Sequence, residues 1–556
     1  MYTFTAARCL TGWALLLAAL AASPSLAQTT TAPAWGGASQ IGPGPIYVTR
    51  SAVDAAGNTY QVSTFTNALT LGGTSLTSVG NTDAYLAKFT ASGTLAWIRQ
   101  LGSAGFEAGN DLVLDAAGNV YITGNYTNAI SLGNGLSLTD GGGTSNKLFV
   151  VRYSPQGTPE WAQQSQLTTT GSTAVGSGIG LDAAGNVHVA GYFGRNVSIG
   201  SSSVSTTTFQ PGNFLARFAG GTGTLLSLVK AFEYGPSTGT ATYTYPVLAV
   251  APTGEDYLLN HANQPAIFGG TTYSSRGGND VLVARYSAQG ALEWVQQAGG
   301  AADDRMRRAR TDAAGNLYIA GYFTGPAQFG TTTLPGAGDY DGFLLKYSSQ
   351  GVMQWVQPGG GPGSDGFGDV VLDAAGNAYV TGNFDGTAQY GPATLTSAGS
   401  RDATVAAYTP QGQLRWVQQA GGTGFDVAYD LGFDGAGYLR VVGRFEGTCV
   451  FGPATLTVAT GSELFLARLG TTPLAVRPAV AAQALAFYPN PAHDQVQLPG
   501  LPAGSAVQLV DALGRVARAT RVAAGAVSVQ GLPAGLYTLR ATDAQSRPVS
   551  GRVLVQ

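Results

Sequence analysis

A five-residue phrase, Asp-Ala-Ala-Gly-Asn, recurs along the chain and constrains its fold more than any other feature. Counting one variant and one degenerate copy, the successive start positions are separated by 61, 67, 69, 61, 61 and 61 residues. A period of this length predicts one supersecondary unit per repeat, each burying its apolar surface against its neighbours. We define repeats 1 to 7 by these turns, which begin at Asp54, Asp115, Asp182, Ala251, Asp312, Asp373 and Asp434.

Each repeat contains four short runs of β character. Around the turn at Asp373, residues 370–372 and 378–382 flank the phrase, while 344–347 and 354–356 hold a basic-aromatic pair and a Trp. Gly suits the left-handed residue of the turn, and the Asp side chain can accept nearby backbone amides. The chain has 81 Gly among 556 residues and only 11 % charged residues, a composition typical of short strands joined by tight turns. Four strands, repeated seven times and apolar on both faces, predict an all-β, seven-bladed β-propeller.

The tryptophan positions predict how such a ring closes. Repeat 7 stops after residues 465–469 without a Trp run, whereas Trp35 precedes the first turn by 19 residues, as Trp97 precedes the second by 18. We therefore expect the N-terminal segment to supply the missing strand of repeat 7, which leaves no sheet edge open. The other tryptophans of the fourth run are Trp161, Trp294, Trp355 and Trp416, and Leu228 takes this place ahead of the degenerate turn.

The repeats also resemble a known family. The phrase at 115–124, together with the Asp-x-Phe-Leu-x-Lys-Tyr run at 341–347 and the following Trp, is similar to the seven-bladed β-propeller repeat (SBBP) family of bacterial exported proteins. The resemblance covers roughly residues 35–470. It implies a propeller and assigns no chemistry.

The N-terminus predicts export. Residues 1–27 combine Arg8, a short apolar stretch at 13–20 and a small-x-small site at 25–27, which is typical of a signal peptide. No later run reaches the roughly 18 apolar residues of a membrane helix, so we expect no transmembrane segment. Because Cys9 would leave with the signal, Cys449 would remain as a single buried thiol on a strand and no intrachain disulfide could form.

A change of composition after residue 470 predicts a second domain. The expected order is a propeller at 28–470, a Pro/Ala linker at 471–484, and a small Ig-like β-sandwich at 485–556. The module opens with Tyr-Pro-Asn-Pro at 488–491 and continues with Asp-x-x-Gly-Arg at 511–515 and Gly-x-Tyr-x-Leu-Arg at 535–540. In these motifs and their order it resembles the type A C-terminal sorting domain of the type IX secretion system, although Arg552 stands where Lys is commoner. The resemblance implies recognition by the type IX machinery and delivery to the outer-membrane surface or the medium. Its sorting-signal residues would be Tyr488, Pro489, Asn490, Pro491, Asp511, Gly514, Arg515, Gly535 and Tyr537.

Most acidic residues fall at repeated positions. Six are the turn Asp, and others precede the turn by eight or four residues or open the third run. Side chains that recur in several repeats are expected to build turns and ion pairs, so we identify no catalytic and no cofactor-binding residue. The alternative is an acidic ring that binds Ca²⁺, since equivalent loops of a propeller converge and Ca²⁺ prefers oxygen ligands. That ring would consist of Glu107, Asp304, Asp365 and Asp426.

A few other residues invite a functional interpretation. His188 occupies a position held by Tyr in other repeats, and no His pair has metal-ligand spacing. The Arg-rich stretch at 303–310 is expected to be a solvated loop, or alternatively a contact for an anion or acidic glycan. Aromatic residues of the degenerate region, Tyr234, Tyr243 and Tyr245, could pack in loops or stack on sugars.

These observations favour an exported, cell-surface binding or interaction protein without enzymatic activity. The net charge of −3 lacks the basic footprint of a nucleic-acid-binding protein. We expect a monomer with a glycan or protein ligand on one propeller face. The alternative function is a carbohydrate-active enzyme, either a polysaccharide lyase or a glycoside hydrolase.

Overall fold

The computed structural model describes residues 32–43, 50–139, 145–167, 172–208, 210–236, 244–470, 483–511, 516–542 and 548–556. The predicted signal peptide lies outside this described part of the chain. The chain divides into two compact parts, Met1–Ala475 and Val476–Gln556. All elements assigned in the described ranges are β-strands. No helix among these residues is long and apolar enough to cross a membrane.

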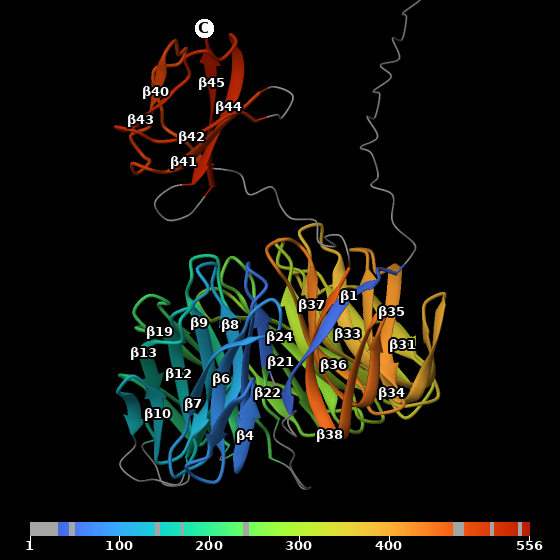
Figure 1. Ribbon diagram of the computed structural model, residues 1–556. Helices are drawn as coiled ribbons and strands as arrows, with labels where there is room; N and C mark the ends of the chain where they lie inside the picture. The colour runs from blue at the N-terminus through green and yellow to red at the C-terminus, as the bar shows by residue number, and fades with distance from the viewer. Residues whose placement is uncertain are drawn as a thin grey trace, which may run out of the picture. The chain divides into compact units, whose positions relative to one another are not determined.

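Each of the seven repeats forms four antiparallel strands, paired in the order first-second-third-fourth (Figure 1). Repeat 1 contains β2 (Arg50–Val53), β3 (Thr59–Phe65), β6 (Asp83–Phe89) and β7 (Leu95–Leu101). Repeat 2 contains β8 (Glu107–Leu114), β9 (Val120–Tyr126), β12 (Lys147–Tyr153) and β13 (Pro159–Gln164). Repeat 3 contains β14 (Thr173–Leu181), β15 (Val187–Gly194), β18 (Gly212–Phe218) and β19 (Leu225–Tyr234). Repeat 4 contains β20 (Val247–Val250), β21 (Asp256–Ala262), β24 (Asp280–Tyr286) and β25 (Leu292–Gly300).

The last three repeats follow the same order. Repeat 5 contains β26 (Arg305–Thr311), β27 (Leu317–Phe323), β30 (Asp341–Tyr347) and β31 (Met353–Gly360). Repeat 6 contains β32 (Gly366–Leu372), β33 (Ala378–Tyr390), β34 (Ala393–Tyr408) and β35 (Leu414–Gly422). Repeat 7 contains β36 (Val427–Phe433), β37 (Leu439–Phe451) and β38 (Ala454–Leu469), and its fourth strand is β1 (Trp35–Pro43).

A hairpin between the second and third strands extends every repeat, which the four-run pattern did not predict. In five repeats it forms separate strands, and in repeats 6 and 7 it lengthens the second and third strands themselves. From repeat 4 onward the hairpin pairs with the fourth strand of the preceding repeat, as in Gly421↔Val450. Neighbouring repeats are thereby joined by backbone hydrogen bonds. The separate hairpins are β4 (Ala68–Leu71) with β5 (Thr74–Thr77), β10 (Ala129–Gly133) with β11 (Leu136–Thr139), β16 (Asn196–Ile199) with β17 (Ser202–Ser205), β22 (Ala266–Phe268) with β23 (Thr271–Tyr273), and β28 (Ala327–Phe329) with β29 (Thr332–Leu334).

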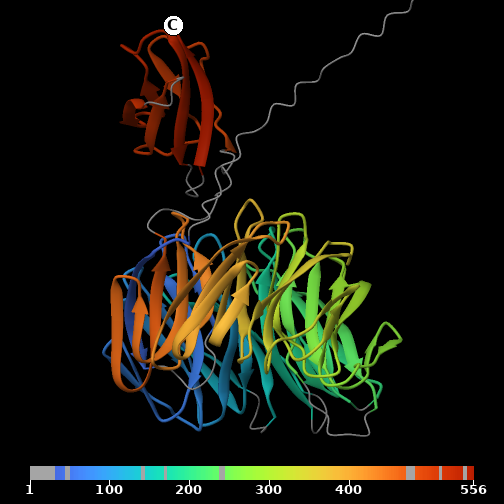
Figure 2. The ribbon, with the colours of Figure 1, turned by 90° about the vertical axis from the view of Figure 1, so that its right-hand side faces the viewer.

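The first strands of the repeats contact one another in chain order. Successive first strands contact each other in the order β2, β8, β14, β20, β26, β32 and β36, and β36 contacts β2. Figure 2 shows the sheets following one another along the chain from blue through green to orange. Blue β1 lies against orange β38 in Figure 1. In the pairing of these two strands, Trp35 is opposite Leu469 and Ala38 is opposite Ala467. The order of contacts therefore returns to its starting point.

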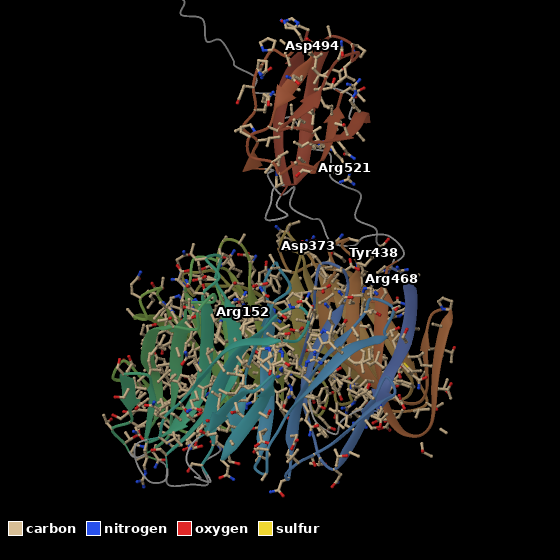
Figure 3. The ribbon with its side chains drawn as sticks, turned by 60° about the vertical axis from the view of Figure 1, so that its left-hand side comes forward. Arg152, Asp373, Tyr438, Arg468, Asp494 and Arg521 are labelled. Atoms are coloured by element: carbon tan, nitrogen blue, oxygen red, sulfur yellow. The ribbon has the colours of Figure 1, made fainter. Side chains whose placement is uncertain are left out.

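The turn Asp builds the link between first and second strands. In repeat 1, Asp54 Oδ1 accepts the backbone N–H groups of Ala56 and Asn58 at 2.9 Å, and its Oδ2 accepts the Asn58 side-chain amide at 2.8 Å. Gly57 sits at φ 81°, a conformation that Gly adopts without steric cost. Repeat 7 has Tyr438 in place of Asn, and the Arg468 guanidinium lies 4.8 Å from its ring centroid (Figure 3).

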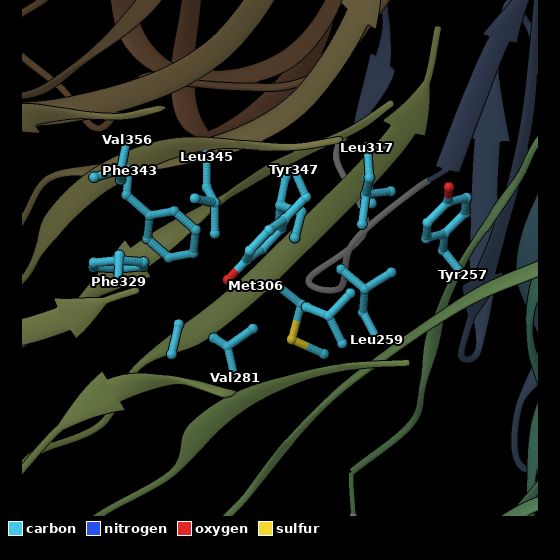
Figure 4. Close-up of a cluster of buried hydrophobic side chains, with 14 of the residues drawn as sticks. Tyr257, Leu259, Val281, Met306, Leu317, Phe329, Phe343, Leu345, Tyr347 and Val356 are labelled. Atoms are coloured by element: carbon cyan, nitrogen blue, oxygen red, sulfur yellow. The ribbon is translucent and has the colours of Figure 1, made fainter. Parts of the chain in front are cut away.

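Buried apolar residues fill the space between adjacent repeats. Figure 4 shows one cluster in which Tyr257 and Leu259 of β21, Met306 of β26 and Phe343 of β30 pack together. Third strands such as β30 are buried on both faces, as their continuous apolar runs predicted. Tryptophans of the fourth strands add hydrogen bonds between repeats, because Trp97 Nε1 donates to the carbonyl of Pro155 at 3.2 Å in the next repeat.

Trp35 does not take the position predicted for it. In repeat 1, Trp97 stands opposite Lys88. The residue of repeat 7 that is equivalent to Lys88 is Arg468, and it stands opposite Gly37. Trp35 therefore lies two residues before the position that the spacing predicted. Its indole N–H donates to the carbonyl of Gln419 at 2.8 Å in the preceding repeat. Sequence spacing missed this shift because register irregularities separate positions 35 from 37 and 40 from 42.

The C-terminal part is a small β-structure with its own apolar core. Five strands form one sheet in the order β39-β45-β44-β41-β42, and β40 pairs with β43. Leu509, Leu539 and Val553 lie in the core. The strands are β39 (Gln483–Ala484), β40 (Gln495–Gln497), β41 (Ala506–Val510), β42 (Val516–Arg521), β43 (Ala526–Ser528), β44 (Gly535–Thr542) and β45 (Pro548–Val555).

Candidate functional site

The two ends of the repeats differ in how strictly they repeat. The Asp turn follows the first strand and has nearly the same sequence in each copy, whereas the residues at the start of that strand vary. Ten residues after the turn position, where the second strand returns to this variable end, the chain carries Thr64, Asn125, Tyr192, His261, Tyr322, Asn383 and Arg444. Repeated positions serve the common fold, so side chains that differ among repeats are the candidates for a specific site.

A pocket of about 300 Å³ lies at this variable end in repeats 5 to 7. Four arginines and five aromatic residues contribute to its lining, and none of its described lining residues is Asp, Glu or His. The chain as a whole has a net charge of −3, so a lining that contains only cations is a local departure from its composition. The lining residues are Arg50, Arg307, Tyr322, Tyr340, Gly366, Phe367, Gly368, Asn383, Arg401, Phe425, Val427, Ala428, Tyr429 and Arg444.

Three of the four pocket arginines lie against aromatic rings. The Arg307 guanidinium lies 5.1 Å from the Tyr322 ring centroid. Those of Arg401 and Arg444 lie 4.8 and 5.6 Å from the centroid of Phe425. Such cation–π contacts orient a guanidinium without neutralising its charge.

Two of these arginines also have acidic partners just outside the lining. Arg401 forms a two-pronged pair with Asp385, with N–O distances of 2.9 and 2.8 Å, and Arg444 pairs with Glu446. Arg307 is exposed and has no carboxylate within ion-pair distance among the described residues. Its charge is therefore the least compensated in the pocket.

Buried donors at the pocket lack acceptors. Within the described part of the chain, neither Asn383 Nδ2 nor Arg444 Nε has a hydrogen-bond partner, although both atoms are buried. A buried N–H without an acceptor is costly, at about 1–3 kcal/mol. Both atoms are buried, so these unsatisfied donors lower the stability of the fold and are not themselves exposed to the cavity.

A network of buried charges lies among the first strands. Four residues before the turn, three repeats carry Asp111, Asp369 and Asp430, and two carry Arg50 and Arg308. Arg308 is buried, its Nη2 lies 3.1 Å from Asp111 Oδ1, and its Nε lies 3.9 Å from Asp369 Oδ1. Arg308 and Asp369 lie on the contacting strands β26 and β32, whereas Asp111 lies on β8, which does not neighbour β26 in the order of contacts.

The same network shifts the pKa values of its members. Burial, and then the nearby Arg308, lower the pKa of Arg50 to about 10. Burial raises the pKa of Asp430 to about 6, with repulsion from Asp369 adding to the effect and Arg308 opposing it. Sequence reasoning assigns the three acids to the fold, places Arg308 in a solvated Arg-rich loop and does not consider Arg50. Aligning the repeats four residues before each turn would have found them.

The four residues of the predicted acidic ring are each bound within their own loops. Asp365 accepts the backbone N–H groups of Gly361 at 2.6 Å and Asp385 at 2.9 Å, and Glu107 accepts that of Ser103 at 2.9 Å. Burial raises the pKa to about 7 for Glu107 and Asp304 and to about 6 for Asp365 and Asp426. No group of three or more His, Cys, Asp or Glu among the described residues could hold a metal ion. The calcium interpretation stays a prediction.

His188 belongs to an ion-pair cluster between repeats 3 and 4. Its Nδ1 lies 2.6 Å from Asp256 Oδ1, and Arg217 binds Asp256 Oδ2 through Nε at 3.0 Å and Nη2 at 2.6 Å. Asp256 is fully buried at the start of β21, beside the degenerate turn. Arg217 compensates this buried charge and His188 forms a hydrogen bond to the same carboxylate, which gives the His a structural role in place of the usual Tyr.

Arg307 lines the pocket, and the structure places the other singled-out residues elsewhere. Cys449 is a free, buried thiol on β37, as predicted, and burial followed by repulsion from Asp426 raises its pKa. The stretch 303–310 is not the solvated loop that was expected, because residues 305–310 belong to β26, where Arg308 is buried in the charge network and Arg307 lines the pocket. Tyr245 is 57 % exposed and its ring lies 6.0 Å from that of Tyr192. Tyr234 is buried, and Tyr243 lies outside the described residues.

The C-terminal part has a clear relative among known families. Residues 486–556 match the family model described as a secretion system C-terminal sorting domain. These residues are a type IX sorting domain. The sorting domain implies export through the type IX system, with the protein at the cell surface or secreted.

Several predicted signal residues hold the last strand of the sorting domain. Asn490 donates from Nδ2 to the carbonyl of Arg552 at 3.0 Å, and its Oδ1 accepts the N–H of Leu554 at 2.8 Å. Tyr537 is buried and its hydroxyl donates to the carbonyl of Pro533 at 2.9 Å, whereas Tyr488 is 59 % exposed. Pro489 and Pro491 flank Asn490, Gly535 begins β44, and Asp511 follows β41. Gly514 and Arg515 lie outside the described residues.

Other comparisons are more distant. Over 449 residues the chain is 20 % identical to an uncharacterised WD repeat-containing protein of Acanthamoeba polyphaga mimivirus. That match covers 67 % of this chain and 32 % of the viral protein, so the chain spans about a third of that relative. PorZ, a surface component of the type IX secretion system of Porphyromonas gingivalis, is 13 % identical, with 91 % of this chain and 70 % of PorZ covered and a TM-score of 0.29. A puromycin hydrolase is 12 % identical, and the match covers 93 % of this chain and 59 % of the hydrolase with a TM-score of 0.39. Similarities this low carry no inference about activity.

Proposed function

We propose that the N-terminal part is a closed, seven-bladed β-propeller that acts as a non-enzymatic binding protein on the cell surface or in the medium. The circular order of contacts among the first strands and the pairing of β1 with β38 support closure. The resemblance of the repeats to the SBBP family agrees with this fold. The sorting domain supplies the route of export.

The composition of the pocket carries the functional part of this proposal. Most glycoside hydrolases place two carboxyl groups on either side of the reacting bond. The described pocket lining has no carboxylate and no His, but it has four guanidinium groups and five aromatic rings. Arginine and aromatic side chains are enriched where proteins bind partners. These residues therefore suit recognition better than hydrolysis.

Filling the pocket tests the proposal without changing its charge. Gly366 lines the pocket, and a Cβ placed on it would lie 3.7 Å from Tyr340 and 3.8 Å from Tyr322, in ordinary van der Waals contact. Gly366→Leu should therefore project into the cavity at little cost to folding. Gly221→Leu is the matched control, because the added Cβ would meet nothing within 4 Å.

The assay is binding of the full chain without residues 1–27 to an array of glycans and peptides, followed by incubation with each bound glycan. We expect Gly366→Leu to lose the ligands that wild type and Gly221→Leu retain, with an unchanged melting temperature. No new reducing ends or unsaturated products should appear. Binding that Gly366→Leu leaves intact would refute the pocket as the site, and product formation that it abolishes would establish the enzyme alternative.

A further inference from the structure

We propose that the ligand of the repeat 5–7 pocket is a carboxylated sugar, such as a uronate residue of an acidic polysaccharide. This inference rests on the proposed binding function and names its ligand class. Two properties of the pocket carry it: the kind of charge that its lining presents and the shape of its aromatic surface.

The positive charge of the pocket lining favours an anionic ligand. Arg307 is exposed and has no acidic partner in the described part of the chain, and it lines the pocket with three further arginines. Neither Asp385 nor Glu446 lines the cavity itself. A planar guanidinium matches a carboxylate with two parallel hydrogen bonds, and such charge-assisted bonds are about twice as strong as neutral ones.

The aromatic residues of the lining favour a ligand that contains a sugar ring. Tyr322, Tyr340 and Tyr429 line the pocket together with Phe425 and are partly exposed. Aromatic faces pack on the apolar C–H face of a sugar, while tyrosine hydroxyl groups can exchange hydrogen bonds with its hydroxyls. Tyr322 and Phe425 already contact the pocket arginines, and the part of the aromatic surface that stays exposed is available to a sugar.

The size and placement of the pocket favour a saccharide over a protein partner. A volume of about 300 Å³ lies at the lower end of the range for small-molecule sites and admits one or two sugar rings. The four arginines come from four different strands, β2, β26, β34 and β37, which suits a compact ligand better than an extended peptide. A polysaccharide could place one acidic residue in the pocket and continue outside it.

The test is isothermal titration of the full chain without residues 1–27. The probes are trigalacturonate, a neutral trisaccharide of the same length, hexaglutamate and inorganic phosphate. We expect trigalacturonate to bind and the other three to bind at least tenfold more weakly. Arg307→Gln should weaken trigalacturonate binding about tenfold or more, because one charge-assisted contact is lost.

Arg468→Gln is the matched control, because Arg468 also stacks on a tyrosine, Tyr438, but at the turn end. It should bind trigalacturonate like wild type. The carboxylated-sugar class would be refuted if the neutral trisaccharide bound equally well, or if the protein preferred hexaglutamate or phosphate. In that case Gly366→Leu would still decide the proposed binding function. Unchanged binding in Arg307→Gln, or no binding of trigalacturonate by folded protein, would also overturn this inference. Cleavage of trigalacturonate would keep the ligand class and refute the non-enzymatic proposal.

Discussion

Replacing Arg308 by Met should strongly destabilise the N-terminal part. Arg308 is 6 % exposed and lies 3.1 Å from Asp111 and 3.9 Å from Asp369, with Asp430 contributing to its electrostatic environment. Met preserves much of the side-chain volume but leaves these buried carboxylates without their central cation. Removing one partner of a buried ion pair costs about 3–5 kcal/mol, a large fraction of the roughly 5–15 kcal/mol that stabilises a folded protein.

The loss should depend on pH in a specific direction. Burial already raises the pKa of Asp430 to about 6, and loss of the cation would raise it further. A carboxyl whose folded-state pKa exceeds its unfolded value stabilises the protein at low pH, and this contribution is lost as pH rises through the folded-state pKa. Arg308→Met should therefore lose more stability at pH 8 than at pH 5.

Guanidinium unfolding followed by tryptophan fluorescence at both pH values measures this effect. Arg310→Met is the matched control, because its side chain is 39 % exposed although it lies 3.7 Å from Asp369. A partly exposed pair contributes about 0–1 kcal/mol, so Arg310→Met should differ little from wild type. A loss below about 1 kcal/mol in Arg308→Met at pH 8, or an equal loss at pH 5, would show that the network is not coupled as we describe.

Three further outcomes follow from the described contacts. Trp35→Ala should cost about 3–5 kcal/mol in chemical unfolding, because the ring is buried 5.2 Å from Phe451; an unchanged midpoint would contradict the role of β1 in repeat 7. The raised pKa of Asp304, about 7, predicts that its contribution to stability falls between about pH 4 and pH 7, so Asp304→Asn should flatten the pH dependence of the melting temperature; equal slopes would refute this. A chain ending at Leu469 should fold but stay in the periplasm, as fractionation would show, and its efficient delivery to the surface would contradict the sorting role.

Local sequence determined the parts of this protein that depend on neighbours in the chain. The turn at Asp54 could be predicted because its Asp, Gly and Asn interact within five residues, and the same interactions recur in each good copy. Burial of the third strands followed from their continuous apolar runs. The sorting domain could be recognised from short motifs because Asn490 and the other motif residues all lie within one small domain.

Tertiary structure alone decided the candidate site and the charge network. Arg308 and Asp111 are 197 residues apart, and they meet only because first strands of different repeats come together. The pocket likewise combines Arg307, Arg401 and Arg444 from three repeats, where no local pattern marks them as a group. Trp35 shows the same limit on a smaller scale, since its partner is set by strand register and not by its distance from the turn. Interactions within a turn depend on the chain's local geometry, whereas a site between repeats depends on how the sheets pack, and a repeat sequence specifies the first far more directly than the second.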